Sequence, residues 1–261
     1  MLKRIALFSA VLVACVPALR SEEWHKSFTV GAQPDLRVDA KDGSITVKSW
    51  SEKSILARVT TTGWKIGSGE LDIIDRQTGD HVELTLRLPS MSWGGTRRSI
   101  QVEISVPRET KLDLRTGDGA IRVNDVEGEM RLTSGDGSVT AESAVLGPVT
   151  ARTGDGRISM RGRLTNLSLR TGDGSIMVEA LPGSRPASSW RVETGDGSVT
   201  MRVPSDFAAN VDLHTGDGSL TVDLPISTDQ RDKRTVRGKL NGGGPVITVH
   251  TGDGSIKIGR I

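Results

Sequence analysis

The sequence is poor in aromatic residues, in cysteine and in long helical patterns. Among its 261 residues, aromatic side chains make up 3% and tyrosine is absent. A core of stacked Val, Ile and Leu layers needs few large rings, so this composition agrees with a thin, layered fold. The single cysteine, Cys15, excludes a disulfide within the chain. The protein must therefore depend on its backbone hydrogen bonds and its apolar core.

Familiar catalytic motifs are also missing. The chain has no phosphate-binding loop, no Gly-x-Ser-x-Gly nucleophile elbow and no His-Glu-x-x-His zinc motif. These absences give no support to an enzyme, and we predict that the protein is not one. The sequence also has no stretch long and apolar enough for a transmembrane helix in the mature chain.

The first residues resemble a targeting segment. Lys3 and Arg4 precede an apolar run from Ile5 to Val16, which predicts a secretory signal peptide over residues 1–18 and an exported protein. Two forms of processing are open, because the segment ending at Cys15 also resembles a bacterial lipobox that would make this cysteine a lipid anchor. Removing residues 1–18 lowers the formal net charge from +2 to 0, which argues against a basic nucleic-acid-binding protein.

The main positive feature is a repeated phrase, Thr or Ser followed by Gly-Asp-Gly. Seven copies occur, separated by 18 to 23 residues over most of the range. With the first glycine as position zero, apolar residues recur at −5, −3, +4 and +6, with mostly polar residues between them. This alternation predicts a strand, a tight bend and a second strand in each copy, with one buried face. The copies begin at Thr116, Ser134, Thr153, Thr171, Thr194, Thr215 and Thr251.

Two arrangements of these strands are open. In a sandwich of hairpins, the two strands of each copy pair with each other around the bend. In a β-solenoid, the bend is a corner and each strand pairs with its counterpart in the next copy. We favour the solenoid, a parallel β-helix-like fold with coils of about 18–23 residues, because near-identical copies suit stacking in register. Single apolar residues in the connectors, namely Val126, Leu164 and Leu181, predict a third inward wall.

The rest of the chain departs from this pattern in two places. Residues 22–110 are predicted to form an irregular N-terminal β region and cap, which contains a degenerate copy around Asp42 and a hairpin around Gly79. Residues 111–261 hold the β-solenoid repeats. Within them, residues 224–246 form a polar, basic and then glycine-rich excursion between the last two coils, expected to be a loop or a small hairpin.

The short strands around Asp-Gly-Ser-Ile, the Val106-Pro107 strand end and the run from Gly242 to Pro245 that leads into Thr251 carry a resemblance. The chain resembles the bacterial exported β-strand-repeat proteins labelled "putative adhesin", a domain family of unknown function, over residues 28–261. The resemblance implies the fold and an adhesin-like role, and it brings no functional residues with it.

The bend aspartates are the most regular candidate site. If the coils stack, these carboxylates form a column with a spacing of about 4.8 Å, and bare carboxylates at that distance repel. We expect compensation by backbone N–H groups within each turn and by nearby arginines; a bridging Ca²⁺ is the alternative, and no other cofactor is expected. The column comprises Asp118, Asp136, Asp155, Asp173, Asp196, Asp217 and Asp253.

Three further sets of residues deserve a prediction. The hydroxyls at position −1 are expected to bond one another across coils. His214 and His250 both stand at position −2 and, with Glu193 nearby, form a weak candidate metal site, although two surface histidines are the simpler interpretation. Trp64 and Trp93 lie in predicted loops and could form a patch that stacks on sugars.

Together these features predict a non-enzymatic, exported cell-envelope or surface protein that acts as an adhesin-like interaction scaffold, with an envelope or extracellular protein or glycan as partner. The alternative is a carbohydrate-binding or carbohydrate-active protein on a β-helix scaffold. A groove with unlike acidic residues or an aromatic-lined cleft would favour that alternative.

Overall fold

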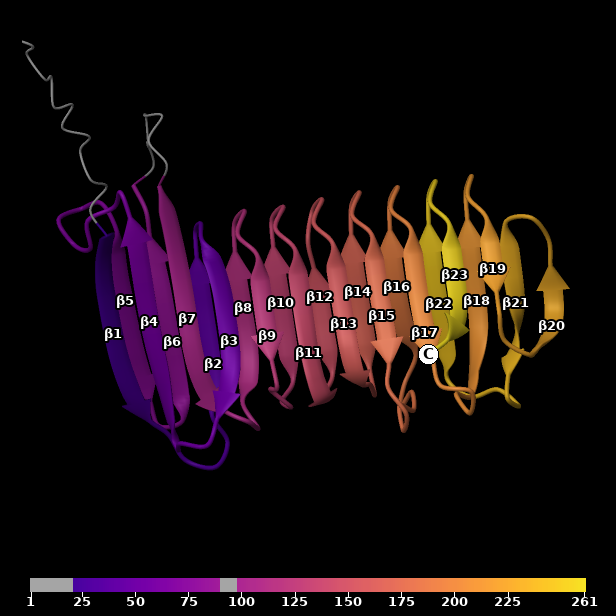
Figure 1. The fold of residues 1–261 in the computed structure, drawn as a ribbon, viewed down its shortest axis with the longest axis horizontal. Helices are drawn as coiled ribbons and strands as arrows, with labels where there is room; N and C mark the ends of the chain where they lie inside the picture. Colours follow the sequence, from indigo (N-terminus) through magenta and orange to yellow (C-terminus); the bar gives the residue numbers. More distant parts are fainter. Residues whose placement is uncertain (1–20, 90–97) are drawn as a thin grey trace, which may run out of the picture.

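The computed structural model describes residues 21–89 and 98–261, which form strands, turns and bends and contain no helix. No helix in these residues could span a membrane. The strands build two large mixed sheets that both extend along the long axis of the molecule, one facing the other (Figure 1). Cys15 and Trp93, and the predicted signal segment 1–18, lie outside the described residues.

The first sheet, sheet A, has 11 strands, and its order is not the order of the sequence. From one edge to the other it contains β1 (Ser21–Thr29), β4 (Ser54–Thr62), β7 (Ser99–Pro107), β3 (Ser44–Trp50), β9 (Ile121–Asn124), β11 (Val139–Val145), β13 (Ile158–Arg163), β15 (Ile176–Ala180), β17 (Val199–Val203), β23 (Ile256–Arg260) and β19 (Leu220–Val222).

The second sheet, sheet B, has 12 strands. Listed from the end of the molecule where sheet A begins, it contains β5 (Asp72–Thr78), β6 (His81–Arg87), β2 (Asp35–Ala40), β8 (Lys111–Thr116), β10 (Met130–Ser134), β12 (Val149–Arg152), β14 (Leu167–Thr171), β16 (Trp190–Thr194), β22 (Val246–Thr251), β18 (Ala209–Thr215), β21 (Thr235–Leu240) and β20 (Ile226–Arg231).

Equivalent strands of successive copies pair in parallel, as the repeat predicts. In sheet B, Met130 of β10 stands opposite Leu112 of β8. In sheet A, Val139 of β11 stands opposite Ile121 of β9, at the same position of the repeat. The strands that flank each bend lie in different sheets, so they do not form hairpins with each other. We call each strand–bend–strand unit a coil.

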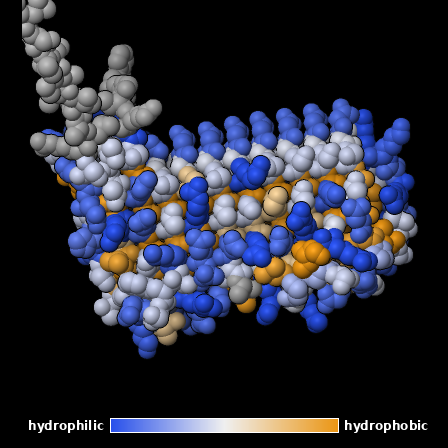
Figure 2. Space-filling view, viewed as in Figure 1, coloured by the Kyte–Doolittle hydropathy of each residue, from blue (hydrophilic) through white to orange (hydrophobic). Residues whose placement is uncertain are grey.

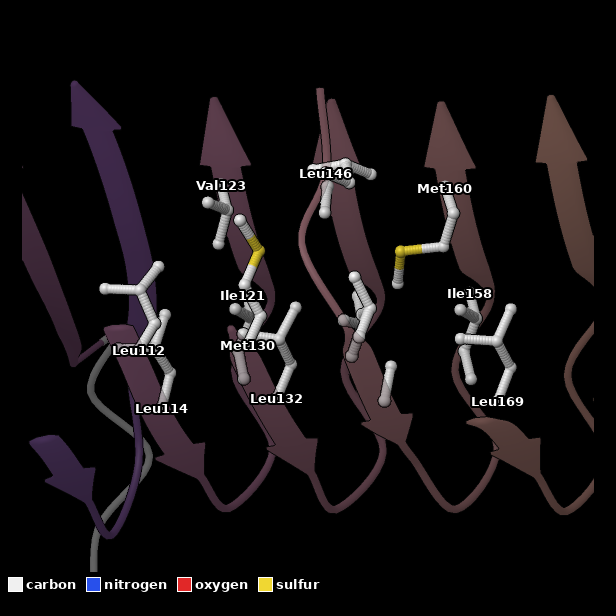
Figure 3. Packing of buried hydrophobic residues seen from close by; sticks show 14 of the residues in the cluster. Leu112, Leu114, Ile121, Val123, Met130, Leu132, Leu146, Ile158, Met160 and Leu169 are labelled. Carbon is white, nitrogen blue, oxygen red and sulfur yellow. The ribbon is translucent and has the colours of Figure 1, made fainter. Parts of the chain in front are cut away.

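The core fills the space between the two sheets. In the seven coils, the residues at −5 and −3 are at most 3% exposed. Figure 3 shows leucines and Met130 of sheet B facing Ile121, Val123, Ile158 and Met160 of sheet A. The expected third wall is not a sheet: the connectors instead contribute single residues. Val126, Leu146 and Leu164 are fully buried, whereas Leu181 is only half-buried.

The N-terminal region joins the stack more closely than the sequence indicates. The degenerate copy is a true coil, because Leu36 pairs with Leu112 and Ile45 with Ile121 in parallel register. The predicted hairpin is present as β5 and β6, which pair antiparallel around a turn containing Gly79 with φ of 60°. Antiparallel strands β1, β4 and β5 follow at this end, where β1 and β5 are the outermost strands of the two sheets.

The coils at the two ends do not follow the sequence order. At the C-terminal end, β16 and β17 pair with β22 and β23, and the earlier coil of β18 and β19 lies outside them. Figure 1 accordingly shows the C-terminus within the stack rather than at its tip. At the other end, β2 and β3 lie between β6 and β7 on one side and β8 and β9 on the other.

Segment 224–246 explains the exchange at the C-terminal end. It contains the hairpin β20–β21, and β21 pairs antiparallel with β18. Since β21 occupies the outer edge of β18, β22 takes the inner edge, between β18 and β16. Asp232 shapes the hairpin turn by accepting the backbone N–H groups of Arg234 and Thr235 at 2.9 and 2.8 Å. The bond from Arg234 lowers the pKa of the Asp232 carboxyl.

Candidate functional site

The stacked bends form one long edge of the molecule. Figure 1 shows the turns from sheet B to sheet A projecting in a row, and Figure 2 shows a regular line of hydrophilic residues along that edge. The bends stack directly, because the N–H of the first glycine in one coil donates to the first glycine carbonyl of the neighbouring coil. Examples are Gly252 to Gly195 at 2.5 Å and Gly216 to Gly252 at 2.6 Å.

The glycines are required for close approach and not for positive φ. None of the glycines in the seven Gly-Asp-Gly bends has positive φ; only Gly43 of the degenerate copy does, at 112°. A Cβ atom built on the second glycine of any of these bends would lie closer than 3.0 Å to the carbonyl oxygen of the equivalent glycine next to it. Positive φ, the commonest reason for glycine in a tight bend, therefore does not apply to the seven copies, and backbone contact between coils explains the glycines instead.

The hydroxyls at position −1 hold neighbouring bends together. All seven are buried, with at most 8% exposure. Each donates to the second glycine carbonyl of the adjacent coil, as Thr194 does to Gly174 at 2.9 Å. In several coils the same oxygen accepts the N–H of its own second glycine, for example Gly197 to Thr194 at 3.2 Å. The predicted contact between hydroxyls is therefore replaced by hydroxyl–carbonyl bonds.

Replacing Thr194 with valine is expected to lower the free energy of unfolding by about 1–3 kcal/mol, because the Gly174 carbonyl and the Gly197 N–H lose a buried partner. Thr194→Ser is the matched control and should stay within about 0.5 kcal/mol of the parent protein, since Ser134 fills the same position in another coil. Urea denaturation measures both. Equal stability of the valine and serine variants would show that these bonds contribute nothing.

The seven bend aspartates are all exposed at the tips of the row. Their expected compensation is not found in the described residues: none accepts a backbone N–H of its own turn, and Asp217 alone has an ion pair, with Arg234 at 2.8 Å. The arginines at position −2 turn elsewhere, Arg115 to Asp113 at 3.3 Å and Arg170 to Glu193 at 3.5 Å. The row is thus a line of solvated carboxylates whose repulsion is weakened by water and salt.

A groove of about 610 Å³ runs beside this edge across four neighbouring strands of sheet B, β12, β14, β16 and β22. It lies at the same level of each coil, so it follows the stack axis and crosses the strands. Its residues are Arg152, Thr153, Arg170, Thr171, Gly172, Glu193, Thr194, Gly195 and His250. At a strand spacing of about 4.8 Å, the groove spans about 14 Å, the scale of a short extended chain.

The floor of the groove presents unlike groups in a fixed order. Arg152 and Arg170 are opposite each other on β12 and β14, and Glu193 and His250 are opposite each other on β16 and β22. Both guanidiniums and the imidazole are exposed, and only Arg170 has a carboxylate partner in the described part of the groove. The groove therefore offers two strong hydrogen-bond donors at one end and a carboxylate beside an imidazole at the other.

The two predicted histidines do come together, because β22 lies beside β18. Their rings stack with centroids 4.9 Å apart and an interplanar angle of 30°. His214 also contacts the Thr235 hydroxyl through Nδ1 at 3.2 Å. Within residues 21–89 and 98–261, no group of three or more His, Cys, Asp and Glu side chains is arranged to hold a metal ion. Coil order, which the sequence does not reveal, places His250 rather than His214 next to Glu193.

Trp64 does not offer a free stacking surface. Its side chain is 7% exposed and packs in the core, and the Arg98 guanidinium lies over its ring at 4.3 Å from the centroid. Trp64 is therefore not available for the predicted sugar-binding patch, and its other member, Trp93, lies outside the described residues. On the outer face of sheet A, Arg161 bonds Glu179 at 3.0 Å and Glu142 at 2.6 Å, and these bonds raise the pKa of its guanidinium.

Comparison with known proteins places this fold in a family. No curated protein matches the sequence. Among solved structures, a putative cell adhesion protein from Clostridium sporogenes is 13% identical, with 93% of this chain and 100% of that chain covered and a TM-score of 0.43. A putative adhesin from Bacteroides fragilis is 11% identical, with 92% and 97% covered and a TM-score of 0.40.

The sequence matches the Toastrack family (Toastrack DUF4097) twice, over residues 32–185 and 129–259. The two overlapping matches take in nearly all of the described stack, including the degenerate copy, the groove and the exchanged coils. They confirm the resemblance to the repeat family that the bends and strand ends indicated. The chain belongs to the Toastrack family.

Proposed function

We propose that the protein is an exported β-solenoid of the bacterial cell envelope that acts as a non-enzymatic, adhesin-like interaction scaffold. The parallel, in-register pairing of equivalent strands supports the solenoid description. Export rests on the charged and apolar residues before Val16, and the lipobox-like segment at Cys15 suggests a lipid anchor as one form of attachment.

The groove along the stack axis is the observation that carries the binding role. It crosses four coils at one level, so a ligand lying in it meets side chains from successive repeats. Weak contacts that repeat along a rigid face add up when the ligand itself repeats. An extended glycan or peptide of the envelope suits this shape better than a compact small molecule.

A scaffold accounts for the carboxylates better than an enzyme does. Catalytic acid and base pairs need surroundings that separate their pKa values. The bend aspartates are instead exposed in seven near-identical turns. Glu193 is the one acidic residue that lines the groove, so a pair of unlike carboxylates is not available among the described lining residues.

A carbohydrate-binding role is the second candidate, and the groove residues favour it. Arg152, Arg170, Glu193 and His250 supply hydrogen-bonding groups of the kinds that recognise hydroxyls and carboxylates of sugars. The described residues that line the groove include no tryptophan or phenylalanine on which a sugar ring could stack. We therefore propose that a glycan binds in the groove and that polar side chains hold it there.

An array of glycans and cell-envelope components tests both candidates, with and without Ca²⁺. We expect binding to at least one extended component, weakened about tenfold or more in Arg152→Gln/Arg170→Gln, which corresponds to about 1.4 kcal/mol or more. The matched control is Arg122→Gln/Arg157→Gln, which removes two exposed arginines on the side of sheet A, one within β9 and one just before β13. No binding to any component, or equal losses in both variants, would contradict the proposed role of the groove.

The Ca²⁺ arm of the array examines the aspartate row separately. Since the bends are held by backbone and hydroxyl bonds, we expect binding and melting temperature to be unchanged by a chelator. A fall in melting temperature on chelation would instead assign Ca²⁺ to the row.

A further inference from the structure

The two ends of the stack carry opposite charge. The N-terminal end consists of β1 and the segment 70–80, which contains β5. It has six acidic and two basic residues, a formal net charge of −4. These are Glu22, Glu23, Glu70, Asp72, Asp75 and Asp80 against Lys26 and Arg76.

The C-terminal end of the stack is basic. It consists of the uncharged strand β19 and the hairpin β20–β21, residues 226–240, with five basic and two acidic residues and a formal net charge of +3. These are Arg231, Lys233, Arg234, Arg237 and Lys239 against Asp229 and Asp232. All seven side chains belong to exposed residues. The stack is therefore a rod with an acidic and a basic end.

Both ends also leave strand edges available. In the described sheets, β5 and β20 are the outermost strands of sheet B, and β1 and β19 those of sheet A. No further strand of sheet A covers the outer side of β19, and its side chains show this. Leu220 and Val222 of β19 are half-buried, whereas residues at the same positions in the other six coils are at most 2% exposed. Unpaired edges of this kind readily accept another strand.

We propose that copies of this protein associate head to tail, with the basic hairpin end of one copy against the acidic N-terminal end of the next. Opposite charge attracts these two ends, and like charge opposes contacts between two identical ends. The partner at each end is a second copy of the chain, because the opposite end of that copy carries both the opposite charge and an unpaired strand edge.

Strand direction is compatible with this contact. β20 runs parallel to β18, through two antiparallel pairings, while β5 runs antiparallel to β6 and to the parallel strands of sheet B. Continuing sheet B from one copy to the next therefore pairs β20 with β5 antiparallel. The Arg231 end of β20 then lies beside the Asp72 end of β5. The two sheets also end at different levels. Sheet A extends beyond sheet B at the N-terminal end, and sheet B extends beyond sheet A at the C-terminal end.

Such an association goes beyond the proposed scaffold role and extends it. The contact joins two different surfaces, so it does not close on itself, and it generates chains of copies. Each added copy repeats the groove along the same axis, which raises the number of contacts with a long ligand.

Sedimentation velocity over a range of protein concentrations tests the proposal. The weight-average mass should rise with concentration at about 0.05 M NaCl, and the association constant should fall about tenfold or more by about 0.5 M NaCl. Arg231→Glu/Lys233→Glu changes the formal charge of the basic end from +3 to −1, and Glu23→Lys/Asp72→Lys/Asp75→Lys changes that of the acidic end from −4 to +2, so each variant should be monomeric. An equimolar mixture of these two variants should associate again, because the two altered ends are opposite in charge and the two unaltered ends remain so.

Arg122→Glu/Arg131→Glu is the control, since these exposed residues lie on β9 and β10 in the middle of the stack. It should associate like the parent protein, and circular dichroism verifies that each variant is folded. A parent protein that remains monomeric at low salt overturns the proposal. So does association that the end variants leave unchanged, or a mixture that stays monomeric.

Discussion

Replacing Gly174 by alanine is expected to destabilise the protein by about 3 kcal/mol or more, an unusually large effect for adding one methyl group. A Cβ at this position would lie closer than 3.0 Å to the carbonyl carbon and oxygen of Gly156 and to the carbonyl oxygen of Asp155. All three are backbone atoms of the neighbouring coil, so no flexible side chain can move away. The ladder between the two bends must open to admit the methyl group.

Gly259→Ala is the matched control because there the added methyl group meets only ordinary van der Waals contacts. Gly259 is also buried, but the nearest atom to its Cβ position is Asp223 Oδ2 at 3.8 Å, and its φ is not positive. Alanine there should be neutral or should stabilise the protein by up to about 1 kcal/mol, since it restricts the unfolded chain. Urea denaturation of both variants gives the comparison. A Gly174→Ala variant as stable as Gly259→Ala would refute the direct stacking of the bends.

The sequence predicted the local structure well because the pattern of each coil is local. Alternation around each bend placed strands on both sides, and residues such as Leu132 and Val192 are buried as that pattern requires. It could not distinguish two reasons for glycine. A turn with positive φ and a close contact between backbones both exclude a Cβ, and only the positions of neighbouring coils show which applies.

Coil order escaped prediction for a related reason. Because the repeats are near-identical, β16 can pair equally well with Val211 of β18 or with Ile247 of β22 by local pattern alone. The decision depends on the hairpin β20–β21, whose contact with β18 is a long-range event. The groove could not be predicted for the same reason. Arg152, Glu193 and His250 come from separate copies, and the order of the coils has to be known before these residues can be placed near one another.

Burial of Trp64 was missed because its surroundings look like a loop. No alternating strand pattern flanks it, and its cover includes the Arg98 guanidinium from another part of the chain. By contrast, the repeat pattern itself places Trp190 in the core, because it stands at position −5, where the other copies carry Leu, Met, Val or Ile.

Trp190→Ala should lower the free energy of unfolding by about 3–5 kcal/mol, the range for removing a large buried ring. The side chain is fully buried, its ring centroid lies 5.4 Å from that of Phe207, and its Nε1 donates to the Thr165 carbonyl at 2.7 Å. Trp190→Phe separates these terms. It keeps an aromatic ring and leaves the Thr165 carbonyl without this donor, so a smaller loss of about 1–3 kcal/mol is expected.

The position of this aromatic pair gives the experiment a wider meaning. Phe207 lies in the short connector from β17 to β18, which must pass the inserted coil of β22 and β23, and Trp190 pairs directly with Ile247 of that coil. The two rings thus pack where the coil order departs from the sequence. A double-mutant cycle of Trp190→Ala and Phe207→Ala should give a coupling of about 0.5–1.5 kcal/mol, measured by urea denaturation. Strictly additive losses would mean that the rings do not meet, and the inserted position of the last coil would lose its main side-chain support.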